Sequence, residues 1–528
     1  MTSLWKKKKD DPDREESHPR DEEGSTRHSH REPDERTRLL PRENPVYLRP
    51  DDPQVSPYNL WSVRALRGLT SLFLAISFVW WTFLLVSIFV SPPTMHTRGA
   101  GFFSFAYTTL TVGYLIIALL FFSVPSKPMT ICGAILFLFL FVDMCIILGV
   151  ARLRVEEGWV GIASVVWATF IAIYVTLQNR YVAWGKKEEE ERLTGREETR
   201  RPLREWLAVL IATIIMAILA IVSILFTANM ILRIQDASLS APGKMYDVNG
   251  NHYQIHLNCI GNPGRKKDGD RTPTVLLEGS DGPVEHTLQP FIDDVYRNGS
   301  IDRYCYWDRP GYAWSDNAPS PYSAGMAADA LSEALALAGE EGPWVLVAAG
   351  VGGIHSRIFA SRHLLQVRGI MLIDALHEDY LDTLGAPGRG FLLWIRGVLS
   401  PLGLDRLAGA IFKGRSREDR VIGRSAYQTA KVIRAKLQEN LVAKSMTASE
   451  IQTARHVQMA QTPLTVISSG VEVRESEKWR RTQEKLTKVT KNLKNWDVVR
   501  GAVHEVWRSS EGRAIVEKRL RQMVKGKR

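Results

Sequence analysis

The chain has 528 residues, of which 45% are hydrophobic and 24% charged, with a formal net charge of +11. Its basic residues flank apolar runs, and no aromatic-interleaved basic patch or zinc-ligand spacing is present, so we expect no nucleic-acid partner. Four cysteines are too few for a disulfide scaffold. The length allows two or three domains.

The first 57 residues form a charged segment. Lys6, Lys7, Lys8 and Lys9 are followed by Asp, Glu, Arg, His and Pro with few aliphatic residues. Such a composition cannot bury enough apolar surface to offset chain entropy, so we expect residues 1–57 to be a disordered tail. No apolar stretch typical of a secretory signal follows the first charges, and the acidic residues argue against a mitochondrial presequence.

The next part of the chain, residues 58–235, consists mainly of apolar runs. A helix of about 20 apolar residues spans the hydrocarbon core of a bilayer, so five transmembrane helices are predicted. They cover residues 68–91, 99–124, 128–150, 158–178 and 207–232. The third run contains Asp143. An intramembrane carboxylate can mark a functional site, or it can face the bundle interior and accept a hydrogen bond.

The distribution of basic residues predicts the orientation in the membrane. Arg64 and Arg67 precede the first run, and eight basic residues lie between the fourth and fifth: Arg180, Lys186, Lys187, Arg192, Arg196, Arg200, Arg201 and Arg204. The positive-inside rule therefore places the N-terminus in the cytosol and the C-terminal domain on the opposite side. The sequon Asn298-Gly299-Ser300 agrees with a lumenal or extracellular domain.

Residues 243–528 alternate short apolar strands with helical stretches, which predicts a mainly parallel, doubly wound α/β sheet. Strands are expected at residues 253–257, 274–278, 304–307, 344–347, 369–373 and 463–467, and a helix at 324–338.

Several motifs in this domain resemble those of the α/β-hydrolase superfamily, in the same order and spacing. They are TVLLEGSDG at 274–282, WDRPGYAWSD at 307–316, VLVAAGVGG at 345–353, LID at 372–374 and GAVH at 501–504. The resemblance covers about residues 243–523 and implies an α/β-hydrolase fold with a helical cap. The multi-span arrangement is similar to fungal integral membrane proteins described as mitochondrial.

The motif at 345–353 departs from the superfamily at the position of the nucleophile. In these enzymes a serine lies on a sharp strand-to-helix turn, whereas this chain has Gly350, which has no hydroxyl group. Loss of the nucleophile costs roughly 10⁶ in turnover in well-studied triads. We therefore expect a catalytically silent site. If the nucleophile has moved, Ser280 in the expected oxyanion loop is a better candidate than Ser356 or Cys305.

The other members of the triad have candidates. The resemblance implies that His504 occupies the position of the catalytic histidine. The acid normally follows the strand that ends at Ile467, where Glu472 could serve, and Asp374 after the preceding strand is the alternative. Without a nucleophile, either carboxylate could act only as a hydrogen-bond acceptor.

Two further features stay open. The predicted cap, about residues 380–455, contains apolar stretches with interspersed basic residues, which fits either an interfacial segment on the membrane or a cap packed on the core. Cys259 and Cys305 lie on strands that are neighbours in this fold, so they either form a disulfide in an oxidising compartment or remain buried thiols.

The sequence thus predicts a membrane-anchored α/β-hydrolase-fold protein, silent at the usual site, that binds a hydrophobic small molecule or a protein partner. The alternative is an active lipid or ester hydrolase or acyltransferase with a displaced nucleophile. In a third hypothesis, the membrane helices carry the function and Asp143 contributes to it. We expect the lipid membrane as a partner and no cofactor or metal. An endomembrane, the plasma membrane and the mitochondrion all remain open as locations.

Overall fold

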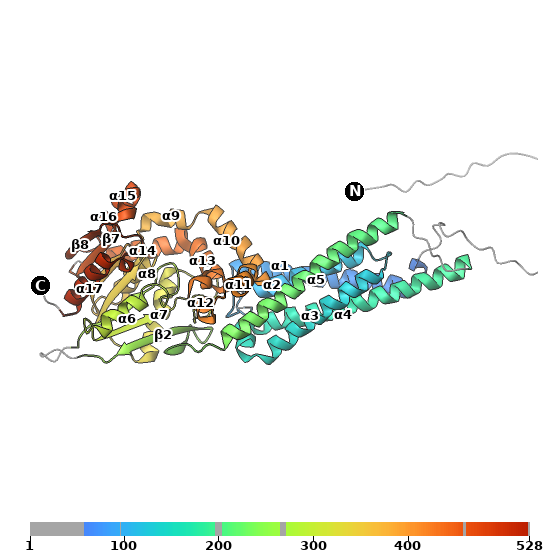
Figure 1. Ribbon diagram of the computed structural model, residues 1–528, viewed down its shortest axis with the longest axis horizontal. Helices are drawn as coiled ribbons and strands as arrows, with labels where there is room; N and C mark the ends of the chain where they lie inside the picture. The colour runs from blue at the N-terminus through green and yellow to red at the C-terminus, as the bar shows by residue number, and fades with distance from the viewer. Residues whose placement is uncertain (1–56, 96, 196–202, 265–270, 458–460, 526–528) are drawn as a thin grey trace, which may run out of the picture. The chain divides into compact units, whose positions relative to one another are not determined.

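The computed structural model describes residues 57–525, apart from residue 96 and segments 196–202, 265–270 and 458–460. The expected disordered tail lies outside the described residues except for Pro57. The described chain combines long apolar helices with an eight-stranded mixed sheet (Figure 1). The predicted fold class, an α/β-hydrolase domain preceded by five membrane helices, is confirmed.

Five helices are long and apolar enough to cross a membrane, and the protein is a membrane protein. They are α1 (Trp61–Phe89), α2 (Phe102–Leu120), α3 (Lys127–Gly149), α4 (Ala151–Thr194) and α5 (Leu203–Ala237). Helix α4 begins seven residues before the predicted span and continues past it, with a non-helical backbone at Gly158. The extra segments mix charged residues with apolar ones, so the apolar run alone could not predict them.

Several polar groups inside the membrane region are hydrogen-bonded to one another, because the hydrocarbon core supplies no water for them. The Tyr107 hydroxyl donates to Asp143 Oδ2 at 2.7 Å, and Asp143 is fully buried. Trp167 Nε1 donates to the Ser77 hydroxyl at 2.8 Å. Asp143 therefore faces the bundle interior and accepts a hydrogen bond there.

The sheet has the order β1-β2-β4-β3-β5-β6-β7-β8. The β1–β2 and β2–β4 pairs are antiparallel, and the other pairs are parallel. The strands are β1 (Lys244–Val248), β2 (Tyr253–Gly261), β3 (Thr274–Glu278), β4 (Arg303–Trp307), β5 (Trp344–Ala349), β6 (Val367–Ile373), β7 (Leu464–Ser469) and β8 (Leu493–Val499). The sequence analysis missed β1 and β8. Both are edge strands that carry charged and exposed residues, so neither shows an apolar run.

Helices cover both faces of the sheet (Figure 1). They are α6 (Gln289–Arg297), α7 (Ala324–Ala338), α8 (Gly352–Arg362), α15 (Gly470–Glu475), α16 (Glu477–Leu486) and α17 (Ser510–Lys525). Alternate residues of the central strands enter two separate cores, because successive strand side chains point to opposite faces. Leu346 of β5 packs in the core with α7 and α8, whereas Val345 and Val347 pack with α6 and α17.

Between β6 and β7 the chain forms a helical cap. Its helices are α9 (Leu381–Leu384), α10 (Pro387–Leu399), α11 (Leu404–Phe412), α12 (Arg417–Val421), α13 (Ala430–Val442) and α14 (Ala448–Val457). The cap packs directly on the membrane helices. Leu393 and Leu437 share an apolar cluster with Leu84 and Phe102, and the buried Arg434 donates to the carbonyl oxygen of Ala100 at 2.9 Å.

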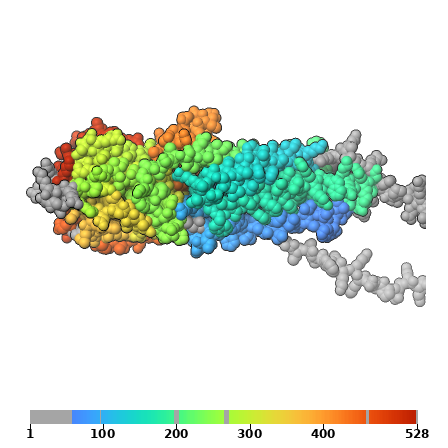
Figure 2. All heavy atoms as spheres, turned by 90° about the horizontal axis from the view of Figure 1, so that it is seen from below, coloured from blue at the N-terminus to red at the C-terminus, as the bar shows by residue number. Residues whose placement is uncertain are grey.

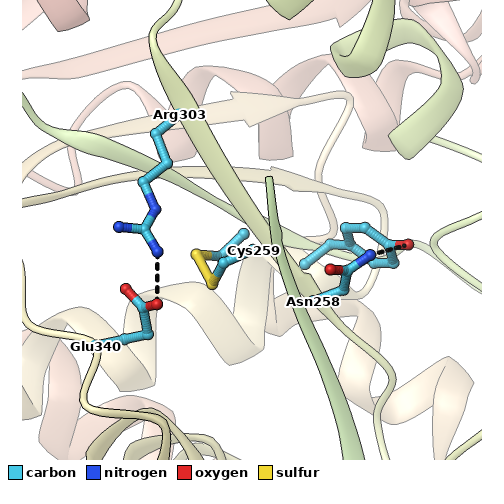
Figure 3. The surroundings of a disulfide bond; sticks show 6 residues. Asn258, Cys259, Arg303 and Glu340 are labelled. Atoms are coloured by element: carbon cyan, nitrogen blue, oxygen red, sulfur yellow. Dashed lines mark hydrogen bonds and ion pairs between the residues drawn. A yellow bond between two sulfur atoms is a disulfide. The ribbon is translucent and has the colours of Figure 1, made fainter. Parts of the chain in front are cut away.

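Cys259 and Cys305 face each other on the antiparallel strands β2 and β4 and form a disulfide (Figure 3). Beside it, Arg303 pairs with Glu340 at 2.5 Å. Of the two alternatives left open by the sequence, the structure contains the disulfide. Cys305 is therefore neither a free thiol nor a candidate nucleophile.

Candidate active site

The carboxyl ends of the parallel strands bring most of the predicted site residues to one edge of the sheet. Ser280 follows β3, Gly350 follows β5, Asp374 follows β6, and His504 lies in the segment after β8. Ligand sites of open α/β sheets form at this edge. Residues far apart in the sequence thus meet because their strands are neighbours.

Gly350 forms a sharp turn between β5 and α8. Its φ of +52° lies in the left-handed region, which glycine adopts without steric cost. The neighbouring glycines allow the close packing of this turn. A Cβ on Gly352 would lie 2.4 Å from the carbonyl oxygen of Gly279, and one on Gly353 would lie 2.6 Å from Ala375 Cβ. The turn keeps the geometry of a nucleophile elbow but carries no side chain.

The hydroxyl group of Ser280 fills the position that the missing side chain would take. A Cβ built on Gly350 would lie 2.3 Å from Ser280 Oγ, closer than two such atoms can approach. The same Cβ would lie 3.3 Å from His504 Nε2. Ser280 and the imidazole of His504 therefore face the same point, and Ser280 is the only hydroxyl residue among the three nearest atoms to it.

Asp374 and His504 form a hydrogen-bonded pair. His504 Nδ1 lies 2.7 Å from Asp374 Oδ2, and Asp374 Oδ1 accepts from Ser469 N and Trp479 Nε1, each at 2.9 Å. The carboxylate is fully buried, whereas the His504 side chain is 40% exposed. A carboxylate can only accept, so Nδ1 carries the proton and the neutral imidazole presents the lone pair of Nε2 to the elbow.

The pKa of His504 lies above its ordinary value of 6.5. Burial lowers this pKa, but the hydrogen bond to Asp374 and the negative charges of Asp374 and Asp281 together outweigh the effect of burial. The imidazolium is thus stabilised where a proton taken from a hydroxyl group would be held.

The other candidates from the sequence lie elsewhere. Glu472 is in α15, where its backbone N–H donates to the Ser469 hydroxyl at 3.1 Å, and Asp374 rather than Glu472 binds His504. Ser356 is buried in α8 and donates to the carbonyl oxygen of Gly353 at 3.3 Å. The acid therefore follows β6 rather than β7, a departure from the usual α/β-hydrolase arrangement.

Arg309, which the sequence analysis did not single out as a site residue, holds the loop that carries Ser280. Its buried guanidinium donates to the carbonyl oxygen of Ser280. The same group lies 3.5 Å from Glu439 Oε1 of the cap. Burial and the positive charge of Arg309 lower the pKa of His355 to about 3, so this neighbouring histidine stays neutral. The motif WDRPGYAWSD was the only signal that could have identified Arg309.

The cap closes over the Ser280 loop. A Cβ on Gly282 would lie 1.9 Å from the Tyr427 hydroxyl, so the side chain of Tyr427 rests directly on the loop backbone. A cavity of about 40 Å³ lies beside the elbow helix, lined by Arg309, Val351, His355 and Glu439 among others. This volume holds little more than water. A larger ligand therefore fits this cavity only if its walls move.

Comparisons with known proteins find relatives along most of the chain. Residues 35–259 match a family model described as a region of unknown function (DUF2417). Over 527 residues the chain is 33% identical to the Schizosaccharomyces pombe protein named "Uncharacterized protein C23C11.06c", covering 93% of this chain and 97% of that one. It is 24% identical over 384 residues to the Saccharomyces cerevisiae "Uncharacterized vacuolar membrane protein YNL115C", covering 62% of this chain and 59% of that one.

Among solved structures, α/β-hydrolase enzymes align with the C-terminal half. MGS-M2, from a deep-sea metagenome library, is 11% identical and covers 54% of this chain and 96% of its own, with a TM-score of 0.38. The enol-lactonase from Burkholderia xenovorans LB400 is 15% identical and covers 53% and 100%, with a TM-score of 0.34.

Proposed function

The chain belongs to the same family as the S. pombe protein C23C11.06c, and we propose that it is a membrane-anchored serine hydrolase or acyltransferase with Ser280 as a displaced nucleophile. One observation carries this proposal: Ser280 Oγ and His504 Nε2 both face the point where a Cβ of residue 350 would lie, at 2.3 and 3.3 Å from it. The geometry thus favours an active hydrolase or acyltransferase with a displaced nucleophile, the second hypothesis from the sequence, over a silent site.

The proposed chemistry follows from the roles of the three residues. Ser280 Oγ attacks the carbonyl carbon of an ester while His504 Nε2 takes the hydroxyl proton, and Asp374 stabilises the imidazolium that forms. His504 returns the proton to the leaving alcohol, which leaves an acyl-Ser280 intermediate. Water, or a second alcohol, then attacks this intermediate with His504 as the base. The backbone N–H of Val351, the residue after the elbow, occupies the usual oxyanion-donor position.

The proposal needs a hydrogen bond between Ser280 Oγ and His504 Nε2 in the reactive complex. Catalytic hydrogen bonds often tighten only when substrate is bound. The contact of Tyr427 with the Ser280 loop suggests how this could happen, since opening the cap to admit a substrate would also free the loop.

The structure of the cap supports the proposal that the substrate arrives from the bilayer. The outer faces of α10 and α11 expose six large apolar side chains: Phe391, Leu392, Leu399, Leu404, Ile411 and Phe412. The inner faces contact membrane helices, since a Cβ on Gly397 of α10 would strike the ring of Phe102, and Arg406 of α11 donates to Asn229 Oδ1 at 2.9 Å.

Orange atoms of the cap stand out of the surface beside the membrane helices (Figure 2). Amphipathic helices of this kind lie in the membrane interface. The lipid membrane is then both the anchor and the source of a lipid-like ester.

We further propose that the α/β domain lies on the non-cytosolic side of a vacuole-type endomembrane. The basic loop before α5, the Cys259–Cys305 disulfide and the vacuolar description of the budding-yeast relatives support this location rather than a mitochondrial one.

Asn298 is exposed at the end of α6. Expression in yeast should give a form that loses mass on glycosidase treatment, and Asn298→Gln should abolish this shift. If the wild-type chain shows no shift and the α/β domain is accessible to protease in sealed vesicles, the α/β domain lies on the cytosolic side instead.

The proposed reactivity is tested by fluorophosphonate labelling of the full-length chain in lipid nanodiscs. Wild type should label, Ser280→Ala should lose labelling, and Ser356→Ala should label like wild type. Ser356 is the matched control because it is also a buried serine near the elbow. Labelling that persists in Ser280→Ala would refute the role of Ser280.

The silent, ligand-binding function remains the alternative outcome. It is favoured by the burial of Ser280 beneath the cap. In that case wild type does not label, whereas the double variant Ser280→Gly with Gly350→Ser should, because it restores an elbow serine and removes the hydroxyl that would clash with it. Lipid or a protein retained through purification would then identify the ligand.

A further inference from the structure

A second histidine–carboxylate cluster lies inside the α/β domain, separate from the residues proposed for catalysis. It consists of His256 on β2, Asp308 directly after β4, and Glu285 in the loop that follows Ser280. Their ligand atoms all lie within 4.8 Å of one another. His256 Nδ1 is 2.8 Å from Asp308 Oδ2 and 3.6 Å from Glu285 Oε1, and no side chain of the three is more than 6% exposed.

The two carboxylates in this cluster have few compensating donors, and the indole N–H of Trp314 is one that faces Glu285. Among the residues that the structure describes, both oxygens of Glu285 and Oδ1 of Asp308 have no hydrogen-bond partner. Over the same residues, His256 is the only basic side chain that pairs with either carboxylate. Buried charges are costly unless they are paired or bind a metal. The cluster therefore needs a positive charge that the described side chains do not supply in full.

The contacts of His256 turn Nδ1 toward the two carboxylates. Nε2 contacts the carbonyl oxygen of Pro242, which can only accept, so Nε2 carries a proton. In the neutral ring the lone pair of Nδ1 then faces Asp308. Histidines that bind metals usually donate their other ring N–H to a backbone carbonyl or carboxylate in this way.

The geometry points to a binding site for a divalent transition-metal cation, Zn²⁺ or Mn²⁺, with His256 Nδ1, Asp308 and Glu285 as ligands. One imidazole nitrogen and two carboxylates suit such cations. The sequence analysis expected no metal because the three ligands are far apart in the chain and show no ligand spacing. This site does not depend on the reactivity proposed for Ser280.

The cation would fix the segment that carries Ser280. Glu285 lies five residues after Ser280, and Asp308 directly precedes Arg309, which donates to the Ser280 carbonyl oxygen. The site thus joins β2, the end of β4 and the loop after β3. Its role would be structural, because it positions the Ser280 loop without touching the proposed reacting atoms.

The test is the metal content of the full-length protein in detergent, purified without chelator and measured by inductively coupled plasma mass spectrometry. Wild type should contain close to one equivalent of Zn or Mn, and Glu285→Gln and Asp308→Asn should contain almost none. Asp293→Asn is the control, because Asp293 has partners of its own in Tyr304 and Arg297 and should leave the metal content unchanged.

A second measurement covers the case in which the variants fail to fold. Wild type is stripped with chelator, and Zn²⁺ or Mn²⁺ alone is added back under calorimetry. Saturable one-to-one binding of either metal supports the site. Wild type that contains no stoichiometric metal and binds neither cation refutes it, whatever the labelling of Ser280 shows.

Discussion

The Asp374–His504 and Asp308–His256 pairs of the α/β domain have very different surroundings. In the Asp374–His504 pair the carboxylate oxygens accept three hydrogen bonds and the histidine reaches solvent. In the Asp308–His256 pair both residues are fully buried, and carboxylate oxygens outnumber the donors that reach them. The first environment suits a proton that moves between a base and a substrate, and the second suits a cation that stays in place.

A histidine–carboxylate contact therefore does not define a function by itself. The partners of the second carboxylate oxygen and the exposure of the free ring nitrogen decide whether the histidine acts as a base or as a ligand. Four predictions test whether the two pairs differ in this way.

The largest effect is expected from Asp374→Asn compared with Asp308→Asn. The amide at position 374 can donate to Nδ1 and so favours the wrong tautomer of His504, which costs roughly 10⁴ in turnover in well-studied triads. Asp308→Asn should instead lose the metal and change the labelling rate far less. Fluorophosphonate labelling rates of both variants provide the measurement. Equal losses of labelling rate in the two variants would contradict the proposed difference between the pairs.

A smaller loss of labelling is expected from Gly350→Ala. The new Cβ would lie 2.3 Å from Ser280 Oγ, so the hydroxyl must shift from its present position. A misplacement of about 1 Å can cost on the order of 10²-fold in rate. Gly388→Ala is a suitable control, because a Cβ there meets no atom within 4 Å. An unchanged rate in Gly350→Ala would show that Ser280 does not react from its present position.

The pH dependence of labelling should report His504. Its Nε2 accepts a proton only when the ring is neutral, so the rate should fall as the pH drops below its pKa, which lies above 6.5. The negative charge of Asp281 contributes to this raised pKa. Asp281→Asn should therefore move the midpoint of the rate profile to lower pH. A midpoint that rises, or a rate without an acid limb, would exclude His504 as the base.

Removal of the metal should give the smallest effect, on stability rather than chemistry. A ligand present at 100 times its dissociation constant stabilises a protein by about 2.7 kcal/mol. Each kcal/mol shifts the melting temperature by roughly 2–4 °C in a domain of this size. A chelator should thus lower the Tm by several degrees in wild type and by nothing in Glu285→Gln. Equal Tm shifts in both proteins would locate the metal elsewhere.

Most of the architecture could be predicted from the sequence because its signals are local. The five apolar runs, the order of the hydrolase motifs and the glycine at position 350 can each be read from a few consecutive residues. The edge strands β1 and β8 were missed because their side chains are exposed and polar.

The site itself was only partly predictable. Nothing local distinguishes Asp374 from Glu472, since the choice depends on which carboxylate the fold brings to His504. The position of Ser280 at the elbow, and the meeting of His256, Glu285 and Asp308, arise from strand neighbours and a loop path. Such contacts between distant segments leave no pattern in a single sequence.

The proposed role of Ser280 is tested by mapping the fluorophosphonate adduct on the full-length wild-type chain by peptide mass spectrometry. We expect a single modified residue, Ser280, in the peptide that follows β3. An adduct on any other residue, or no adduct in a protein whose Gly350→Ser/Ser280→Gly variant labels, would contradict it.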